Sequence, residues 1–283
     1  MRKVAAQAKA VRSASDEVDP TTLGTVALME RVKLAGAELE IHTRGQGRPL
    51  LFLHGEDYFE QHAPFLEALA SRYRLIVPRH PGFGKSTLPA DFRSIDDLAY
   101  LYLDLIDVLK LDRPIVVGAS LGGWIALEVA VRAPATLDRL VLLGSVGVKL
   151  AGREDREFAD IFQIPESEVR TRTFADPERF VPNYATMSEE ALIGVARDRQ
   201  SAVHFAWRPY MHNPVLRKWL SRVRMPTLVV WGDKDGVVAP AYAKSLIDAL
   251  PDSSLRMIAN AGHYPQIERP QDVVSAIEAF AKP

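Results

Sequence analysis

The chain is organised around one stretch in which an apolar run ends on a glycine and a lone serine follows. The run 114–118 is rich in β-branched residues, and residues 124–131 have the apolar spacing of a helix, so a strand, a sharp turn and a helix are predicted. Residues 118–122 read Gly-Ala-Ser-Leu-Gly and fit the G-x-S-x-G pattern of a nucleophile elbow, whose small flanking residues permit a strained turn that lifts the oxygen of Ser120 clear of the sheet. A glycine-rich turn that only happens to carry a serine fits the pentapeptide equally well, so Ser120 needs chemical partners elsewhere in the chain.

Strands alternate with helices on both sides of this turn. Strands are predicted in a hairpin over 31–43 and at 50–53, 75–77, 114–118, 140–143, 226–231 and 255–259. Helices are predicted at 61–71, from a capping box at Ser94 to about Lys110, and at 124–131, 239–250 and 270–281. Because parallel strands need a crossover connection, this alternation predicts an α/β fold with a mostly parallel, doubly wound sheet. Ligands of such sheets bind beyond the carboxyl ends of the strands.

Residues 148–222 interrupt the alternation. The segment contains no apolar strand run, and prolines separate its short helical stretches. It is rich in aromatic residues, including Phe162, Trp207 and Tyr210, which a cap over an apolar pocket would need. A small subdomain with its own aromatic core would show the same enrichment. The predicted organisation is an N-terminal arm (1–28), a core (29–147 and 223–283) and a helical cap (148–222).

The composition of the 283 residues is that of an ordinary globular protein, with 47% apolar residues, 25% charged residues and a formal net charge of -1. This balance gives no reason to expect a nucleic acid or a membrane partner, and no apolar run approaches the roughly 18 residues of a membrane span. The absence of cysteine excludes disulfides and thiolate metal sites and fits a reducing compartment. Residues 4–9 are too polar for the core of a secretory signal. We expect a cytoplasmic protein without a metal, and a homodimer is left open.

Two glycine-containing loops superficially match nucleotide-binding patterns. The turn 45–47 is not followed by a third glycine that opens a helix, as a dinucleotide-binding loop requires. The loop 84–86 reads Gly-Lys-Ser, but Arg79 stands where a phosphate-binding loop needs its first glycine. No cofactor is therefore expected, and the predicted partner is a small-molecule substrate.

Two further residues stand where partners for Ser120 are needed. A serine becomes a good nucleophile when a base takes its proton, and the base in turn needs a carboxylate that fixes its tautomer. His263 follows the last predicted strand and Asp235 follows the strand before it. Because the carboxyl ends of parallel strands share one edge of the sheet, we expect these side chains to meet at Ser120.

With these partners the sequence resembles the α/β-hydrolase superfamily, in its serine-nucleophile, esterase-like branch with a helical cap, from Arg31 to the C-terminus. The motifs that carry the resemblance are His54-Gly55, the 81–86 loop Pro-Gly-Phe-Gly-Lys-Ser, the 118–122 elbow, Trp231-Gly232-Asp233-Lys234-Asp235 and Gly262-His263. Their order and number make the resemblance specific. It implies the α/β-hydrolase fold and a catalytic triad of Ser120, Asp235 and His263.

The resemblance also implies an oxyanion hole made of backbone N–H groups. One belongs to Leu121, directly after the serine, and the other to Glu56, directly after His-Gly. A carboxylate aimed at the oxyanion would oppose it, so the side chain of Glu56 is expected to point towards solvent or a cation such as Arg79. Asp233 is the rival to Asp235 as the acid of the triad, and the family spacing favours Asp235.

Several other side chains are assigned weaker roles. The residues predicted to contact the substrate are His54, Tyr58, Trp207 and Tyr210. His54 is also expected to hold its own loop. His62 is expected at the surface.

Departures from family patterns narrow the expected reaction. Haloalkane dehalogenases and epoxide hydrolases of this fold have an aspartate at the position of Ser120, so both are set aside. Meta-cleavage C–C hydrolases usually have an asparagine before the serine and a glycine-rich stretch after His-Gly, where this chain has Ala119 and, at 56–58, Glu-Asp-Tyr. We expect a serine hydrolase that cleaves a carboxylic ester or lactone of a small, largely apolar substrate through an acyl-enzyme. The alternatives are a C–C bond hydrolase and a non-catalytic member that binds a small molecule.

Overall fold

The computed structural model describes residues 28–56, 58–152 and 154–282, so the predicted arm 1–28 lies outside the described residues except for Leu28. Among the described residues, eight strands form one sheet in the order β1-β2-β4-β3-β5-β6-β9-β10. The strands are β1 (Leu28–Leu34), β2 (Ala37–Arg44), β3 (Pro49–Leu53), β4 (Arg74–Pro78), β5 (Ile115–Ala119), β6 (Arg139–Leu143), β9 (Thr227–Gly232) and β10 (Ser253–Ile258).

The sheet is antiparallel only at one edge. β1 and β2 form a hairpin, β2 pairs antiparallel with β4, and all other neighbours in the sheet are parallel. Side chains of β5 alternate between two apolar clusters, with Val116 in one and Val117 in the other. Both faces of the central strands are therefore buried, which explains their continuous apolar sequence. The predicted hairpin and mostly parallel sheet are confirmed.

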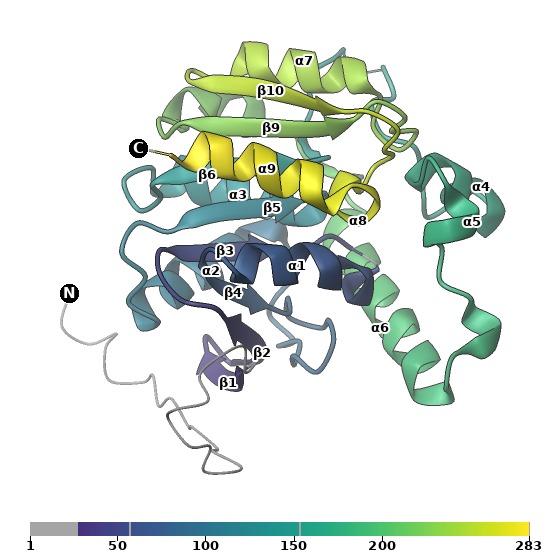
Figure 1. Cartoon of the computed structure of the whole chain (residues 1–283), viewed down its shortest axis with the longest axis horizontal. Coiled ribbons are helices and arrows are strands. Elements are labelled where there is room, and N and C mark those ends of the chain that lie inside the picture. Colours follow the sequence, from purple (N-terminus) through teal and green to yellow (C-terminus); the bar gives the residue numbers. More distant parts are fainter. Residues whose placement is uncertain (1–27, 57, 153, 283) are drawn as a thin grey trace.

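Helices cover both faces of the sheet. The helices of the core are η3 (Phe59–His62), α1 (Ala63–Ala70), α2 (Ile95–Val108), α3 (Leu121–Arg132), α7 (Pro240–Ala249), α8 (Pro265–Glu268) and α9 (Pro270–Ala281). α1 and α9 pack together in front of the sheet in Figure 1, and α2 and α3 pack together behind it. The predicted capping box is present, because Ser94 and Asp97 bond to each other's backbone N–H groups at the start of α2.

The helices α4, α5 and α6 of the insertion, residues 148–222, lie beyond the carboxyl ends of the parallel strands, at the right in Figure 1. Its elements are α4 (Glu166–Thr173), α5 (Pro177–Phe180), η4 (Tyr184–Thr186), α6 (Glu189–Ala206), β8 (His212–Asn213) and η5 (Leu216–Arg222). β8 pairs with β7 (Gly147–Val148), and η5 packs against α3. The predicted domain boundaries stay predictions.

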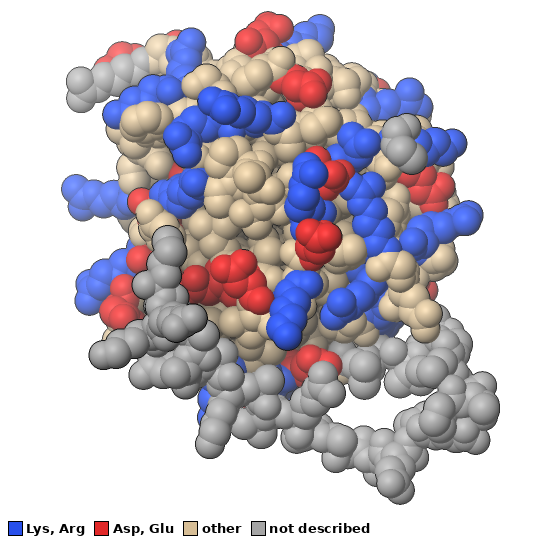
Figure 2. All heavy atoms as spheres, turned by 90° about the vertical axis from the view of Figure 1, so that its left-hand side faces the viewer, with Lys and Arg blue, Asp and Glu red and all other residues tan. Residues whose placement is uncertain are grey.

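The surface away from the insertion carries charges of both signs. Figure 2 shows that Lys and Arg side chains are interspersed with Asp and Glu over this face. Within the described ranges, no helix combines the length and the apolarity needed to cross a membrane.

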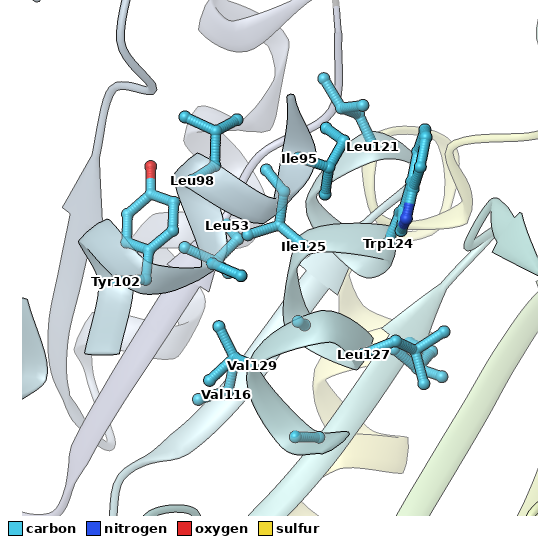
Figure 3. Packing of buried hydrophobic residues seen from close by; sticks show 14 of the residues in the cluster. Leu53, Ile95, Leu98, Tyr102, Val116, Leu121, Trp124, Ile125, Leu127 and Val129 are labelled. Carbon is cyan, nitrogen blue, oxygen red and sulfur yellow. The ribbon is translucent and has the colours of Figure 1, made fainter. Parts of the chain in front are cut away.

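The turn between β5 and α3 is strained. Ser120 has φ 46° and ψ -111°, a conformation that residues other than glycine rarely adopt. A side chain at Gly118 would overlap the backbone of Gly122, and a side chain at Gly122 would overlap the carbonyl of Leu53. Burial of α3 holds the turn in place, since its residues Leu121, Trp124, Ile125 and Val129 pack against α2 and the sheet (Figure 3). The glycines of the motif are therefore steric requirements of this turn.

The close approach at Gly122 generates a first prediction. We expect Gly122→Ala to lower the free energy of unfolding by about 3 kcal/mol, because the added methyl group meets rigid backbone. Denaturant titration measures the change. Gly194→Ala in α6 is the matched control, because a methyl group there meets no atom within 4 Å. That control should be neutral or stabilise by up to about 1 kcal/mol. Equal effects of the two substitutions would contradict the steric argument.

Candidate active site

Three side chains from different strand ends meet in one hydrogen-bonded row. Ser120 follows β5, Asp235 follows β9 and His263 follows β10. His263 Nε2 lies 2.8 Å from Ser120 Oγ, and His263 Nδ1 lies 2.9 Å from Asp235 Oδ2. All three residues are buried. The structure thus brings together the three residues that their positions in the chain singled out.

The carboxylate of Asp235 is held from both sides. Its Oδ1 accepts hydrogen bonds from the backbone N–H groups of Val237 and Val238, each at 2.9 Å. Its Oδ2 is thereby directed at the ring of His263, which fixes the tautomer with a hydrogen on Nδ1. Asp233 is exposed, and its side chain accepts only from the backbone of the loop after β10 among the contacts the structure describes. Of the two acids, Asp235 is the one that contacts His263.

The backbone of the insertion supports both loops. At the end of α4, the carbonyl of Thr173 accepts a hydrogen bond of 2.7 Å from His263 N–H. The preceding carbonyl, that of Arg172, accepts one of 2.9 Å from Gly236 N–H, next to Asp235. The base and the acid are therefore fixed to the same turn of the insertion.

Glu268 is a second support that sequence reasoning missed. Its buried carboxylate accepts hydrogen bonds from the N–H groups of Ala175 and Asp176 at 3.0 and 3.1 Å, and also from Gly262 N–H. It joins the insertion to the loop that carries His263. No spacing or motif in the sequence marks this role, because all three donors are backbone groups and two of them are distant in the chain.

The side chain of Glu56 lies where the oxyanion hole was predicted. Its Oε1 is 3.1 Å from Ser120 Oγ, and its Oε2 accepts a hydrogen bond of 3.3 Å from Leu121 N–H. Glu56 is only 4% exposed, so the prediction that its carboxylate points to solvent or Arg79 is wrong. The N–H of Leu121 opens α3 and needs an acceptor, and the helix N-terminus favours a negative one. Arg79 pairs instead with Asp198.

The hydroxyl of Ser120 has one hydrogen and two acceptors within reach. It donates either to neutral His263 or to Glu56, and in the second case a protonated Nε2 donates to the serine oxygen. Burial disfavours the charged ring, but the carboxylates of Asp235 and Glu56 outweigh burial and raise the pKa of His263 above 6.5. Because the unfolded value is about 6.5, protonated His263 stabilises the fold below that pH, and the contribution is lost as the pH rises through the raised pKa. Glu56 thus favours the form of His263 that cannot accept the serine proton.

A cavity of about 300 Å³ lies beside His263, between the core and the insertion. Much of its wall is apolar and comprises Ile161, Phe162, Ile164, Val169, Ala202, Val203 and Val237. Its charged lining residues are Glu56, Glu166, Arg199 and His263. Glu166 and Arg199 pair with each other at 3.0 Å. A small, largely apolar ligand fits this volume and this lining.

The predicted substrate contacts differ in where they lie. Tyr58 lines the cavity. Trp207 and Tyr210 do not, and their rings contact Phe162, with centroids 6.2 and 5.8 Å away. Trp207 is 41% exposed. Substrate contact by these two residues stays a prediction, and Phe162, which contacts both rings, itself lines the cavity.

The histidines around the site have structural contacts. His54 Nδ1 bonds to the carbonyl of Gly55 at 2.6 Å, and its Nε2 accepts from His80 N–H at 3.1 Å, so both ring nitrogens are used within the core. His62 is fully buried against Phe52, which contradicts its expected surface position. It ends η3 where the chain turns into the apolar side of α1, and burial lowers its pKa to about 3, so it is neutral.

The row consists of the Ser120 hydroxyl, the imidazole of His263 beside it and the carboxylate of Asp235 on the other side of the imidazole. This is the set that activates a serine as a nucleophile. Within residues 28–56, 58–152 and 154–282, no group of three or more His, Asp or Glu side chains could hold a metal ion.

Known proteins resemble this chain in sequence and in fold. A sequence model described as "Alpha/beta hydrolase family" matches residues 50–276. "Lipase 1" of Psychrobacter immobilis is 30% identical over 248 residues, covering 83% of this chain and 77% of the relative. "2-hydroxy-6-oxo-6-(2'-aminophenyl)hexa-2,4-dienoic acid hydrolase" of Metapseudomonas resinovorans is 28% identical over 284 residues, covering 90% of this chain and 91% of the relative. The solved structure "Est816 as an N-Acyl homoserine lactone degrading enzyme" has a TM-score of 0.69 and 27% identity, covering 89% of this chain and 100% of that chain.

The position of Glu56 predicts the direction of a pKa change. We expect Glu56→Gln to lower the pKa of His263, because one of the two carboxylates that favour its protonated form becomes neutral. An NMR titration of the histidine ring signals measures this pKa in the wild type and the variant. Glu60→Gln is the control, since it removes a charge from the neighbouring η3 at a side chain that is 85% exposed. An unchanged or raised pKa in Glu56→Gln would contradict the assigned contact.

Proposed function

The chain belongs to the alpha/beta hydrolase family, and we propose that it is a serine hydrolase that cleaves a carboxylic ester or lactone of a small, largely apolar substrate. Its predicted α/β-hydrolase fold is confirmed by this membership. The observation that carries the proposal is the hydrogen-bonded row of Ser120, His263 and Asp235 at the strained turn. A binding protein without catalysis would have no need of a base placed 2.8 Å from a serine oxygen.

The proposed reaction proceeds through an acyl-enzyme. Ser120 Oγ attacks the carbonyl carbon while His263 Nε2 takes the serine proton, and Asp235 stabilises the imidazolium that forms. His263 then returns the proton to the leaving alkoxide, and the C–O bond breaks. A water molecule, deprotonated by His263, attacks the acyl-enzyme, and the acid is released with the serine restored.

The negative oxygen of each tetrahedral intermediate would be stabilised by backbone N–H groups. Leu121 N–H is one donor and Glu56 N–H is the other in our proposal, and a donor of this kind contributes about 3 kcal/mol. In the described structure the carboxylate of Glu56 occupies the acceptor position at Leu121. The side chain of Glu56 therefore has to leave before the substrate carbonyl enters.

The relatives include both a lipase and a dienoic acid hydrolase, so family membership does not decide between ester cleavage and C–C cleavage. The residues of the site have to distinguish the two reactions. The hydrolase of Metapseudomonas resinovorans is named for a dienoic acid. An acid carries its own carboxylate, and Glu56 would repel a second one beside the nucleophile. "Lipase 1" and the lactone-degrading Est816 are named for ester-type bonds. These observations support ester or lactone cleavage over C–C cleavage.

The proposal is tested by labelling Ser120. A fluorophosphonate probe should label the wild type rapidly and Ser120→Ala not at all, with mass spectrometry locating the adduct. On a panel of small esters and lactones, Ser120→Ala should lose at least about a thousandfold in kcat while retaining the wild-type unfolding midpoint. Rapid turnover by Ser120→Ala would remove the serine from the mechanism. Absence of labelling in the wild type would favour the non-catalytic binding protein.

Asp233 and Asp235 lie in one loop, so the same substitution at each position provides a matched comparison. Asp235→Asn should lower kcat by about ten-thousandfold, since the amide would favour the wrong tautomer of His263. Asp233→Asn removes the same charge two residues away, and it should change kcat by less than about threefold. Comparison of kcat at one pH, well above the pKa of His263, measures both. The reverse ranking would give the acid role to Asp233.

A further inference from the structure

We propose that Glu56 makes this site selective for esters whose acyl part carries a cationic group, such as a quaternary ammonium, and selective against esters whose acyl part carries a carboxylate. The inference rests on the proposed serine hydrolase function and names its substrate class. It follows from the place of Glu56 in the resting site, from where its side chain can go, and from the lining of the cavity.

The carboxylate of Glu56 and a substrate carbonyl compete for one position. Glu56 Oε2 is the acceptor of Leu121 N–H, and Glu56 Oε1 lies 3.1 Å from Ser120 Oγ. A carbonyl that is ready for attack needs the same N–H and must approach the same serine oxygen. Productive binding therefore displaces the side chain of Glu56 from the hole.

The displaced carboxylate has to remain near the substrate. Glu56 follows the end of β3 and lines the cavity of about 300 Å³ into which the acyl group would extend. The cavity's arginine, Arg199, is already paired with Glu166 at 3.0 Å. Arg79 is paired with Asp198. Among the described residues, no lysine or arginine forms an ion pair with Glu56.

With His263 neutral, as attack on the substrate requires, the buried carboxylate of Glu56 lacks a cationic partner among the described residues, and a ligand can supply one. Burying an ionised group costs free energy unless an opposite charge accompanies it. A cationic acyl group would meet the displaced carboxylate, and the aromatic rings of Tyr58, Phe162 and Tyr264 in the cavity lining suit an alkylated ammonium through cation–π contact. A carboxylate on the acyl group would instead place two like charges in one small cavity. Charge thus decides which acyl groups displace Glu56 at low cost.

Three matched esters test this inference. The first has an acyl chain that ends in a tert-butyl group, the second has nitrogen in place of the quaternary carbon, and the third ends in a carboxylate on a chain of the same length. With the wild type, we expect kcat/KM for the ammonium ester to exceed that of its tert-butyl isostere by about tenfold. We expect the carboxylate ester to fall below the isostere by a similar factor.

Variants of Glu56 separate charge from structure. In Glu56→Gln both ratios should shrink to within about twofold, whereas Glu56→Asp, which keeps the charge, should retain the order of the three esters. Asp233→Asn is the matched control for the loss of one negative charge outside the cavity, and it should leave both ratios unchanged. Thermal unfolding of each variant shows whether the fold is retained. Equal ratios in the wild type and Glu56→Gln, or a wild-type preference for the carboxylate ester, would overturn the inference.

A binding measurement distinguishes failure of the inference from failure of the proposed function. Calorimetry on Ser120→Ala should show tighter binding of the ammonium ester than of its isostere, and addition of Glu56→Gln should abolish the difference. If the wild type cleaves neither ester but the binding preference holds, the serine hydrolase function fails and the charge selectivity stands. If the wild type cleaves both esters equally well and Ser120→Ala binds them equally, the charge selectivity fails alone.

Discussion

The backbone conformation of Ser120 is the constraint on which the site depends. A residue with φ 46° and ψ -111° costs about 1–3 kcal/mol, and it persists only when its surroundings hold it. Here the surroundings are the buried helix α3 on one side and β5 on the other, brought together by the close contacts of Gly118 and Gly122. The same turn projects Ser120 Oγ towards the loops after β9 and β10 and leaves Leu121 N–H without a partner inside α3. The nucleophile and the oxyanion donor of the proposed reaction are therefore two results of one local strain.

The carboxylate of Glu56 supplies the acceptor that Leu121 N–H lacks inside α3. A buried N–H without an acceptor costs about 1–3 kcal/mol, and in the described structure the carboxylate satisfies Leu121 N–H. The same contact opposes the proposed reaction, because it fills the position that the oxyanion would take and favours protonated His263. Such a residue, which stabilises the site without substrate but hinders the proposed reaction, is typical of functional sites, because the requirements of folding and of function differ there. In our proposal the ligand resolves the conflict by supplying a charge.

The features that sequence could predict are those set by local pattern. Strand ends follow from apolar runs that stop at turn residues, so the meeting of Ser120, Asp235 and His263 could be expected from the amino-acid sequence alone. Contacts set by distant backbone could not. Nothing near Glu268 indicates that its carboxylate holds the loops at 175–176 and 262 together. The predicted orientation of Glu56 is wrong. The prediction took account of the repulsion between its carboxylate and an oxyanion, but not of the acceptor that Leu121 N–H requires when no substrate is bound.

The insertion supports the loops that carry Asp235 and His263 and also forms part of the cavity wall. Backbone carbonyls at 172 and 173 hold the loops of Asp235 and His263, while the side chains of Val169 and Thr173 line the cavity. Because the supporting groups belong to the backbone, side chains lining the cavity can vary while the triad stays fixed, provided α4 keeps its position. Glu268 fixes that position from the core side. The insertion therefore has two separate roles in the proposed function. Its side chains line the cavity and select the ligand, and its backbone positions Asp235 and His263.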